Sequence, residues 1–255
     1  MPLPLQISLA HARIAGETVA AESSPVPGSA AEAYAVQDQL INLIDSPVVG
    51  WKIGATSTAM QERLGLRAPI SGPIFANSLF ESGTTLERDS YPHDLGAECE
   101  IVLRTKTAVL PGSDPFDVKR ARALVDAVIP AIELVCSRFD ANLDIPPALI
   151  VADGSLHAAL VTGVPLDPPT HDLTTATCTS MIDGEVTASG TGVDVLGGPY
   201  IALAWLINHL ISRGHELPAG SLVSTGTCTG IAPLAREQHA INDAGSLGRA
   251  DVRLS

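Results

Sequence analysis

The chain has 255 residues, of which 28 are acidic and 15 basic, so its formal net charge is −13. An acidic surface repels the phosphates of nucleic acids and of anionic membranes, so we expect neither as a partner. Hydrophobic residues make up 45% of the chain, enough for one large core or for one domain with a small appendage.

The first 47 residues have the pattern of a small helical region. Apolar side chains recur at helical spacing within residues 5–45, at Ala33, Val36, Leu40, Leu43 and Ile44. The proline-containing stretch 23–28 divides this region into two helical pieces, and Ser46-Pro47 ends it. The sequence therefore predicts a helical region over 1–47 and a separate main domain over 48–255.

From residue 48 onward, short strands with turn signals replace the helical pattern. We expect strands over 48–53, 97–104, 131–136, 156–162, 222–224 and 248–254, and helices over 57–64, 117–128 and 199–212. Asp183-Gly184, a preferred two-residue turn, predicts a hairpin between 175–182 and 186–189. Pro130 is expected to break the chain between a helix and a strand. Many strands with few helices indicate an α+β domain with a rolled or sandwiched sheet.

Three carboxylates in apolar strand segments are the first candidates for chemistry. On a strand, Glu98 and Glu100 point to one face, about 6–7 Å apart, where their charges repel each other. Alone, such a pair is typical of an exposed strand face with solvated glutamates. Glu133, however, lies inside the apolar run 128–136, where burying an unpaired carboxylate is costly.

Two kinds of cation can compensate Glu133. One is a basic side chain, for which Arg138 is a candidate, and the other is a divalent ion shared with Glu98 and Glu100. Three carboxylates without histidine or thiolate favour Mg²⁺, Mn²⁺ or Ca²⁺ over Zn²⁺ or Cu²⁺. Such a site leaves about three octahedral positions for water and substrate oxygens. The pattern therefore indicates an open metal site of the catalytic type.

Three further segments carry weaker signals. Lys52, in a short apolar strand bounded by glycines, is either an edge lysine that reaches solvent or a cation or base at the substrate. Asp153-Gly154-Ser155 is ordinary turn chemistry. The Gly/Thr stretch 225–230 can present backbone N–H groups to an anionic oxygen, which makes Thr225 a substrate-binding candidate. It lacks the GxxxxGK[ST] pattern of a nucleotide loop. The histidines are scattered and indicate no Ser-His-Asp arrangement.

The cysteines and the chain start favour a cytoplasmic protein. No CxxC pair occurs among Cys99, Cys136, Cys178 and Cys228. They are typical of core residues in a reduced compartment, not of a zinc site. Residues 1–5 lack a signal-peptide pattern, and the apolar stretch 200–207 is too short to cross a bilayer.

Several segments together resemble the 2-keto-4-pentenoate hydratase and 4-oxalocrotonate decarboxylase family of the fumarylacetoacetate hydrolase superfamily. The resemblance runs in the family's order from about residue 30 onward. It is carried by Gly50-Trp51-Lys52-Ile53-Gly54-Ala55-Thr56-Ser57, Gln61 to Gly65, Gly72-Pro73-Ile74-Phe75, Glu98-Cys99-Glu100, Ala131 to Arg138, Ala152-Asp153, Gly197-Gly198-Pro199 with Ala204-Trp205-Leu206, and Leu217 to Gly226.

The resemblance implies a fumarylacetoacetase C-terminal-like mixed β-roll or sandwich with a small N-terminal helical region, assembled as homo-oligomers. It implies Mg²⁺ or Mn²⁺ held by Glu98, Glu100 and Glu133, with Lys52 and Ser155 as catalytic residues at the substrate. Family substrates come from meta-cleavage of aromatic rings. We therefore expect a small 2-oxo or 2-hydroxy-dienoic acid, hydrated as 2-hydroxypenta-2,4-dienoate or decarboxylated as 4-oxalocrotonate.

Two positions depart from the family pattern. Hydratases commonly carry Asp where this chain has Ile70, which we place among the substrate-binding residues, and the loss of that Asp puts hydration in question. The usual Ala-Asp-Asn-Ala-Ser run reads Ala152-Asp153-Gly154-Ser155 here. One alternative is a C–C hydrolase of acylpyruvates, with His93 and Asp94 as the nearest acid/base candidates. Another is an inactive metal-binding homologue, which Ile70 alone supports.

Overall fold

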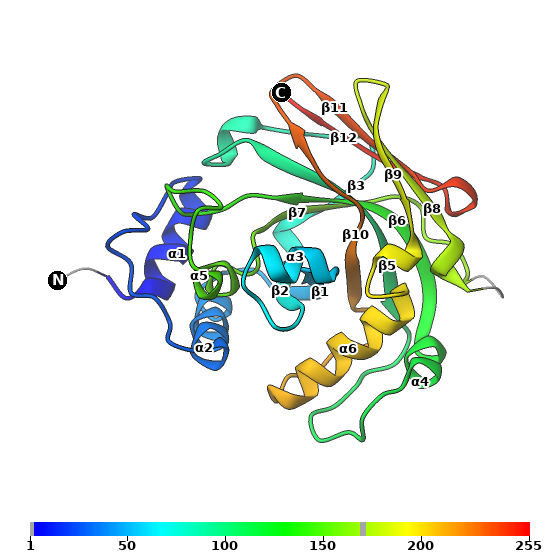
Figure 1. The fold of residues 1–255 in the computed structure, drawn as a ribbon, viewed down its shortest axis with the longest axis horizontal. Helices are drawn as coiled ribbons and strands as arrows, with labels where there is room; N and C mark the ends of the chain where they lie inside the picture. The colour runs from blue at the N-terminus through cyan, green and yellow to red at the C-terminus, as the bar shows by residue number, and fades with distance from the viewer. Residues whose placement is uncertain (1–2, 169–171) are drawn as a thin grey trace.

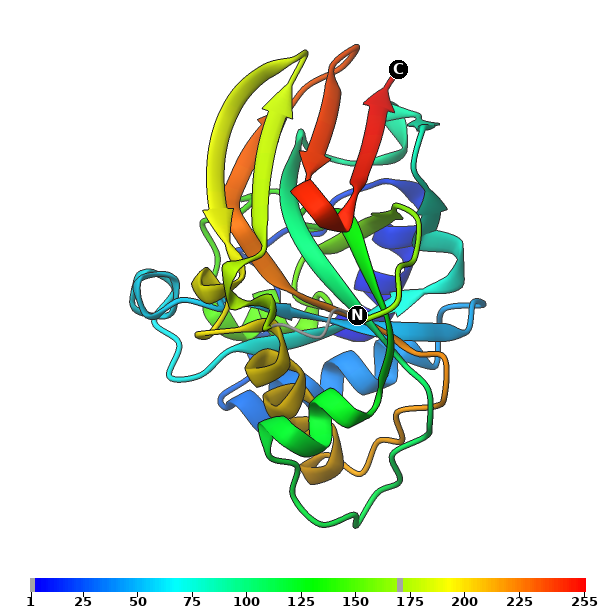
Figure 2. The ribbon, with the colours of Figure 1, turned by 90° about the vertical axis from the view of Figure 1, so that its right-hand side faces the viewer.

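The computed structural model describes residues 3–168 and 172–255. Two sheets form its centre, a seven-stranded one of order β2-β1-β10-β5-β6-β7-β3 and a five-stranded one of order β4-β12-β11-β8-β9 (Figures 1 and 2). The strands are β1 (Val48–Gly54), β2 (Ile70–Phe75), β3 (Leu79–Glu81), β4 (Thr84–Leu86), β5 (Leu95–Thr105), β6 (Val125–Val135), β7 (His157–Thr162), β8 (Thr177–Ile182), β9 (Glu185–Thr191), β10 (Leu222–Leu234), β11 (His239–Asp243) and β12 (Arg249–Leu254). The helices are α1 (Leu5–Ala15), α2 (Ala30–Ile41), α3 (Thr58–Arg63), α4 (Val118–Ala123), α5 (Pro147–Ala152) and α6 (Pro199–Ser212). This α+β arrangement confirms the predicted fold class.

The N-terminal helices lie beside α5 at one side of the molecule, and α6 lies with α4 at another (Figure 1). Ser29 caps α2 by accepting a hydrogen bond from the backbone N–H of Glu32. Leu9 of α1 and Leu40 of α2 pack in one apolar cluster with Phe75 of β2. The two predicted helical pieces are confirmed, and the division of the chain at residue 47 stays a prediction.

The predicted helix over 117–128 is wrong beyond residue 123. The helix α4 ends at Ala123, and β6 begins at Val125 and includes Pro130. Val128 exchanges both backbone hydrogen bonds with Leu166, and the Pro130 carbonyl accepts one from Gly163. Pro130 therefore faces the chain just past the end of β7, where the regular ladder between β6 and β7 has stopped.

The C-terminal half follows the prediction more closely. Asp183 and Gly184 have φ values of 52° and 86°, as a tight hairpin turn between β8 and β9 requires. The strand predicted over 222–224 extends to Leu234, so the Gly/Thr stretch lies inside β10. The strands β2, β3, β4 and β11 and the helix α5 were not predicted.

The helix α6 lies within an apolar segment that is longer than the predicted 200–207. Residues Gly192–Ser212 are long and apolar enough to cross a membrane by length and composition alone. Within the protein, 56% of an 18-residue window of this segment is buried. Leu203 and Leu206 pack in the largest apolar cluster together with Trp51 and Val223. This burial is typical of the core helix of a globular domain.

Candidate metal centre and its cavity

The two middle strands β5 and β6 bring the three predicted carboxylates together. Glu98 lies directly opposite Glu133 in the antiparallel register, and Glu100 lies opposite Ala131. One oxygen from each of the three glutamates lies within 4.8 Å of the others, and all three residues are buried. The exposed, solvated strand face is therefore excluded, and the predicted convergence of Glu98, Glu100 and Glu133 is confirmed.

Lys52 is the basic partner of this cluster. Its Nζ atom lies 3.2 Å from Glu133 Oε2, and the residue is only 3% exposed, so it is not a solvated edge lysine. Arg138, the other candidate, follows the end of β6 and bonds Asp153 at 2.7 Å instead. One ammonium group thus faces three carboxyl groups, which leaves a formal excess of negative charge.

Burial and mutual repulsion disfavour the charged forms of the carboxyl groups. Burial raises the pKa of Glu98 and of Glu100 from 4.5 to about 8, and the neighbouring carboxylates add to the rise while Lys52 opposes it. Burial alone would lower the pKa of Lys52, but the three carboxylates outweigh it and the pKa is raised. The metal-free carboxylate cluster therefore favours the charged form of Lys52.

The hydrogen bonds of the cluster leave oxygens available for a cation. Glu100 Oε2 accepts hydrogen bonds from Ser224 Oγ at 2.5 Å and from the Gly226 N–H at 2.9 Å. Glu100 Oε1 is buried without a hydrogen-bond partner, and Glu133 Oε2 has only the Lys52 ammonium. A buried oxygen without a partner is costly. These carboxyl oxygens fit a hard divalent cation such as Mg²⁺ or Mn²⁺.

His157 holds Glu133 in place through a hydrogen bond, a role that no pattern in the sequence indicated. Its Nδ1 lies 2.9 Å from Glu133 Oε1 and its Nε2 lies 3.0 Å from Ser78 Oγ. Burial, followed by the charges of Arg13, Lys52 and Arg138, lowers the pKa of His157 well below its usual range. The contact with Glu133 is therefore a hydrogen bond of a neutral ring. It fixes one carboxyl oxygen while the other faces Lys52.

We predict that His157→Leu weakens Mn²⁺ binding by about 10–100-fold, the usual effect of losing a group that orients a metal ligand. Isothermal titration of Mn²⁺ checks this prediction. Ser78→Ala is the milder comparison, because it removes the partner of Nε2 and leaves the contact between His157 and Glu133. Unchanged affinity in His157→Leu would show that Glu133 needs no such support.

A cavity of about 290 Å³ opens beside the cluster. Lys52, Glu98 and Ser155 line it, as does Ile70, whereas Glu100 and Glu133 lie deeper. Much of its wall is apolar, formed by Met60, Leu64, Ile70, Ile150, Leu156 and Ile231. The structure thus brings the metal candidates, Lys52, Ser155 and Ile70 to one place.

Thr225 is not brought to this cavity. Its side chain is fully buried, and its hydroxyl donates to the Ile101 carbonyl at 2.7 Å. The register with β5 shifts between Ser224 and Thr227, so the alternation of sides changes there and Thr227 lines the cavity instead.

His93 and Asp94 are not among the residues that line the cavity. The ring of His93 bonds the Phe139 carbonyl at 2.7 Å, and Asp94 is paired with Arg88 at the surface.

Without a divalent ion, the protein is predicted to lose stability as the pH rises from 6.5 to about 8. The pKa values of Glu98 and Glu100 are raised on folding, so the folded state holds more protons than the unfolded state in this window. Between pH 4.5 and 6.5 the lowered pKa values of His157 and His209 oppose this effect, because the unfolded histidines bind protons that the buried rings do not. Melting temperatures in EDTA across the window from pH 6.5 to about 8 test the sign. A curve that is flat or rises would contradict the buried cluster, and Mg²⁺ is expected to reduce the decline.

Comparison with known proteins agrees with the fold. Residues 53–253 match the fumarylacetoacetate (FAA) hydrolase C-terminal family. The chain is 35% identical to 2-keto-4-pentenoate hydratase from Burkholderia vietnamiensis over 86% of its length and 84% of the relative's. It is 32% identical to 4-oxalocrotonate decarboxylase from Pseudomonas sp. (strain CF600), over 80% and 78% of the two chains.

Solved structures give the same assignment. A 4-oxalocrotonate decarboxylase from Pseudomonas putida G7, complexed with magnesium and adipate, superposes with a TM-score of 0.89 at 26% identity, covering 98% of this chain and 96% of that one. Fumarylpyruvate hydrolase from Pseudomonas aeruginosa, at 18% identity and a TM-score of 0.63, covers 82% and 90% and shares the fold. The chain belongs to the fumarylacetoacetate hydrolase C-terminal family.

Proposed function

We propose that the protein is a divalent-metal-dependent lyase that acts on a small 2-oxo or 2-hydroxy-dienoic acid. The observation that carries this proposal is the buried Glu98, Glu100 and Glu133 cluster, which lies beside a cavity lined by one ammonium group and apolar side chains. The names of the relatives, hydratase and decarboxylase, support the same class of reaction.

The side chains around the cavity suit the steps of such a reaction. A bound divalent ion supplies a Lewis acid for the negative charge of a dienolate. Lys52 lines the cavity beside Glu98, so its ammonium group is placed to pair with the substrate carboxylate. Ser155 Oγ gives its hydrogen to the Ser71 carbonyl, which leaves its lone pairs to accept a hydrogen bond from the substrate.

The charges around the cavity favour a substrate with a single carboxylate. Lys52 is the only lysine or arginine among the described residues that line it, and Asp194 adds a negative charge. A second carboxylate would meet apolar side chains or Asp194, where it is poorly stabilised. This observation favours hydration of a 2-hydroxypenta-2,4-dienoate-type acid.

Ile70 instead of an aspartate favours the runner-up, decarboxylation, because an apolar wall destabilises the carboxylate that is lost.

We also propose a cytoplasmic location and a homo-oligomeric state. All four cysteines are free and buried, as in proteins of reducing compartments. Charged residues are only 17% of the chain, which is consistent with surface that becomes covered between subunits. The hydrolase alternative has less support, since its acid/base candidates His93 and Asp94 do not line the cavity.

Ultraviolet assays with three substrates test the proposal. We expect Mg²⁺-dependent loss of the dienoate band of 2-hydroxypenta-2,4-dienoate and a much slower reaction of 4-oxalocrotonate. Faster CO₂ release from 4-oxalocrotonate would reverse the preference in favour of the decarboxylase. Cleavage of acetylpyruvate would favour the hydrolase. An absence of any EDTA-sensitive reaction would overturn the proposed lyase.

A further inference from the structure

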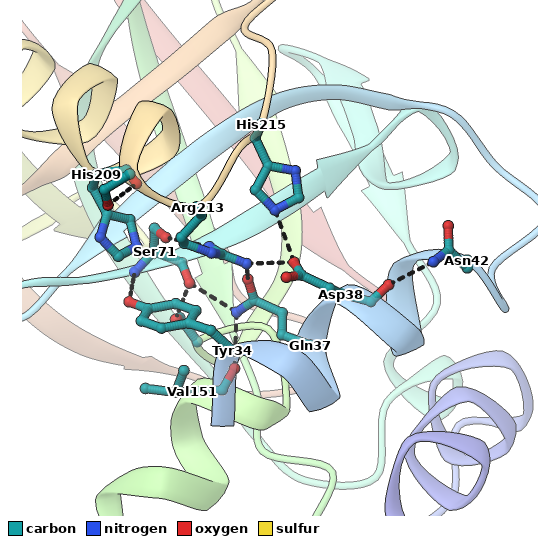
Figure 3. Close-up of polar contacts among 11 residues, drawn as sticks. Tyr34, Gln37, Asp38, Asn42, Ser71, Val151, His209, Arg213 and His215 are labelled. Carbon is teal, nitrogen blue, oxygen red and sulfur yellow. Dashed lines mark hydrogen bonds and ion pairs between the residues drawn. The ribbon is translucent and has the colours of Figure 1, made fainter. Parts of the chain in front are cut away.

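Side chains of α2 bind the open edge of β2 next to the cavity (Figure 3). β2 is the outermost strand of its sheet, so one side of its backbone has no partner strand. The N–H of Ser71 donates to the Tyr34 hydroxyl at 3.1 Å, and the Ser71 carbonyl accepts from Gln37 Nε2 at 2.9 Å. Two side chains of the N-terminal region thus replace the missing strand at this residue.

Gln37 also joins β2 to α5. Its Nε2 donates a second hydrogen bond, to the Val151 carbonyl at 2.8 Å, so the amide bridges two separate segments. Its Oε1 accepts from Arg213 Nη2 at 3.3 Å, and the residue is fully buried. A buried amide with both ends bonded fixes the distance between the segments that it joins.

The two segments joined by Gln37 form one wall of the cavity. Ile70 comes from β2, and Ile150 and Ser155 come from α5 and the turn after it. The Ser71 carbonyl that Gln37 binds also accepts from Ser155 Oγ at 2.7 Å. Ser155 has a φ of 55°, a left-handed conformation that depends on such support.

We infer that Gln37 is a positioning residue, which holds Ile70 and Ser155 at their places in the substrate cavity. The N-terminal helical region then contributes to the substrate cavity through Gln37. This inference rests on the proposed function for the identity of the substrate. It concerns the wall of the cavity, which is separate from the carboxylate cluster.

Asp38, the next residue of α2, offers a matched control. It bonds Arg213 Nη2 at 2.5 Å and His215 Nε2 at 2.9 Å on the outer side of the same network (Figure 3). Its side chain is 36% exposed. Asp38→Asn weakens the packing of α2 against the chain after α6, but it leaves both donors of Gln37 in place.

The test compares Gln37→Leu and Asp38→Asn in the full chain. The measurements are the KM for 2-hydroxypenta-2,4-dienoate, the Kd of Mn²⁺, and the Kd of 2-oxopentanoate, a 2-oxo acid without a double bond to hydrate. We expect Gln37→Leu to raise the KM and the 2-oxopentanoate Kd by about tenfold, as for one or two lost hydrogen bonds, with the Mn²⁺ Kd unchanged. Asp38→Asn is expected to lower the melting temperature and leave the KM unchanged.

Unchanged 2-oxopentanoate binding in Gln37→Leu would overturn the inference, as would an equal loss in Asp38→Asn. If Gln37→Leu does not fold, Gln37→Glu takes its place in the test. Glutamate keeps the shape of the side chain and can pair with Arg213, but it lacks the two N–H groups that bind the Ser71 and Val151 carbonyls. The double variant with Ser155→Ala should lose less than the product of the single losses, because both act through the Ser71 carbonyl. If the unaltered protein shows no turnover, only the proposed function is contradicted. The binding of 2-oxopentanoate still tests whether Gln37 positions the cavity wall.

Discussion

Replacing Glu100 by glutamine is expected to lower the metal-dependent activity by about a thousandfold and to raise the stability of the metal-free protein. The loss of activity follows because a Lewis acid contributes several kcal/mol and each 1.36 kcal/mol is about tenfold in rate. The gain in stability follows because the change removes one of three buried carboxyl groups that repel one another. A residue that served only the fold would not show these opposite signs.

The two effects are measured by steady-state rates in Mg²⁺ and by melting temperatures in EDTA. Glu185→Gln is the control, because Glu185 is exposed on β9 and the change removes the same charge from the surface. It should alter neither quantity. Retained activity in Glu100→Gln, or a lower melting temperature in EDTA, would contradict the account of Glu100.

Lys52→Met is expected to have the largest effect on the metal-free protein. The change leaves Glu133 and its two neighbours without the ammonium group that offsets their charge. Removing one partner of a buried ion pair costs about 3–5 kcal/mol. A divalent ion bound to the same carboxyl groups should restore part of this loss, because a ligand that binds only the folded state stabilises it.

Urea unfolding of Lys52→Met in EDTA measures the loss of stability, and urea unfolding in Mg²⁺ measures how much of it the ion restores. The exposed Lys106 provides the control, since Lys106→Met removes an equal charge far from any buried cluster. Turnover by Lys52→Met should be low even in Mg²⁺, because the substrate carboxylate loses its partner. A stability equal to that of the unaltered chain in EDTA would mean that Lys52 does not hold the cluster together.

The carboxylate cluster was readable from the sequence for a physical reason. Period-two alternation places Glu98 and Glu100 on one face, and the apolar run around Glu133 requires a partner for its charge. The hairpin turn at Asp183 and the helix α6 were also predicted from local patterns that need no tertiary information.

Other features depend on contacts between distant parts of the chain. The bulge that takes Thr225 away from the cavity, and the open position that accommodates Pro130 inside β6, are set by neighbouring strands. Gln37 meets Ser71 and Val151 only in the folded protein, and His157 meets Glu133 across the β6–β7 pair. No short sequence motif predicts these contacts.

Electron paramagnetic resonance of Mn²⁺ tests the assignment of Glu98, Glu100 and Glu133 to one metal site, because it counts bound ions without requiring a substrate. This assignment predicts one tightly bound ion per chain and its loss in the variant that combines Glu98→Gln, Glu100→Gln and Glu133→Gln. A chain that binds no ion, or a triple variant that binds Mn²⁺ as the unaltered chain does, would contradict it.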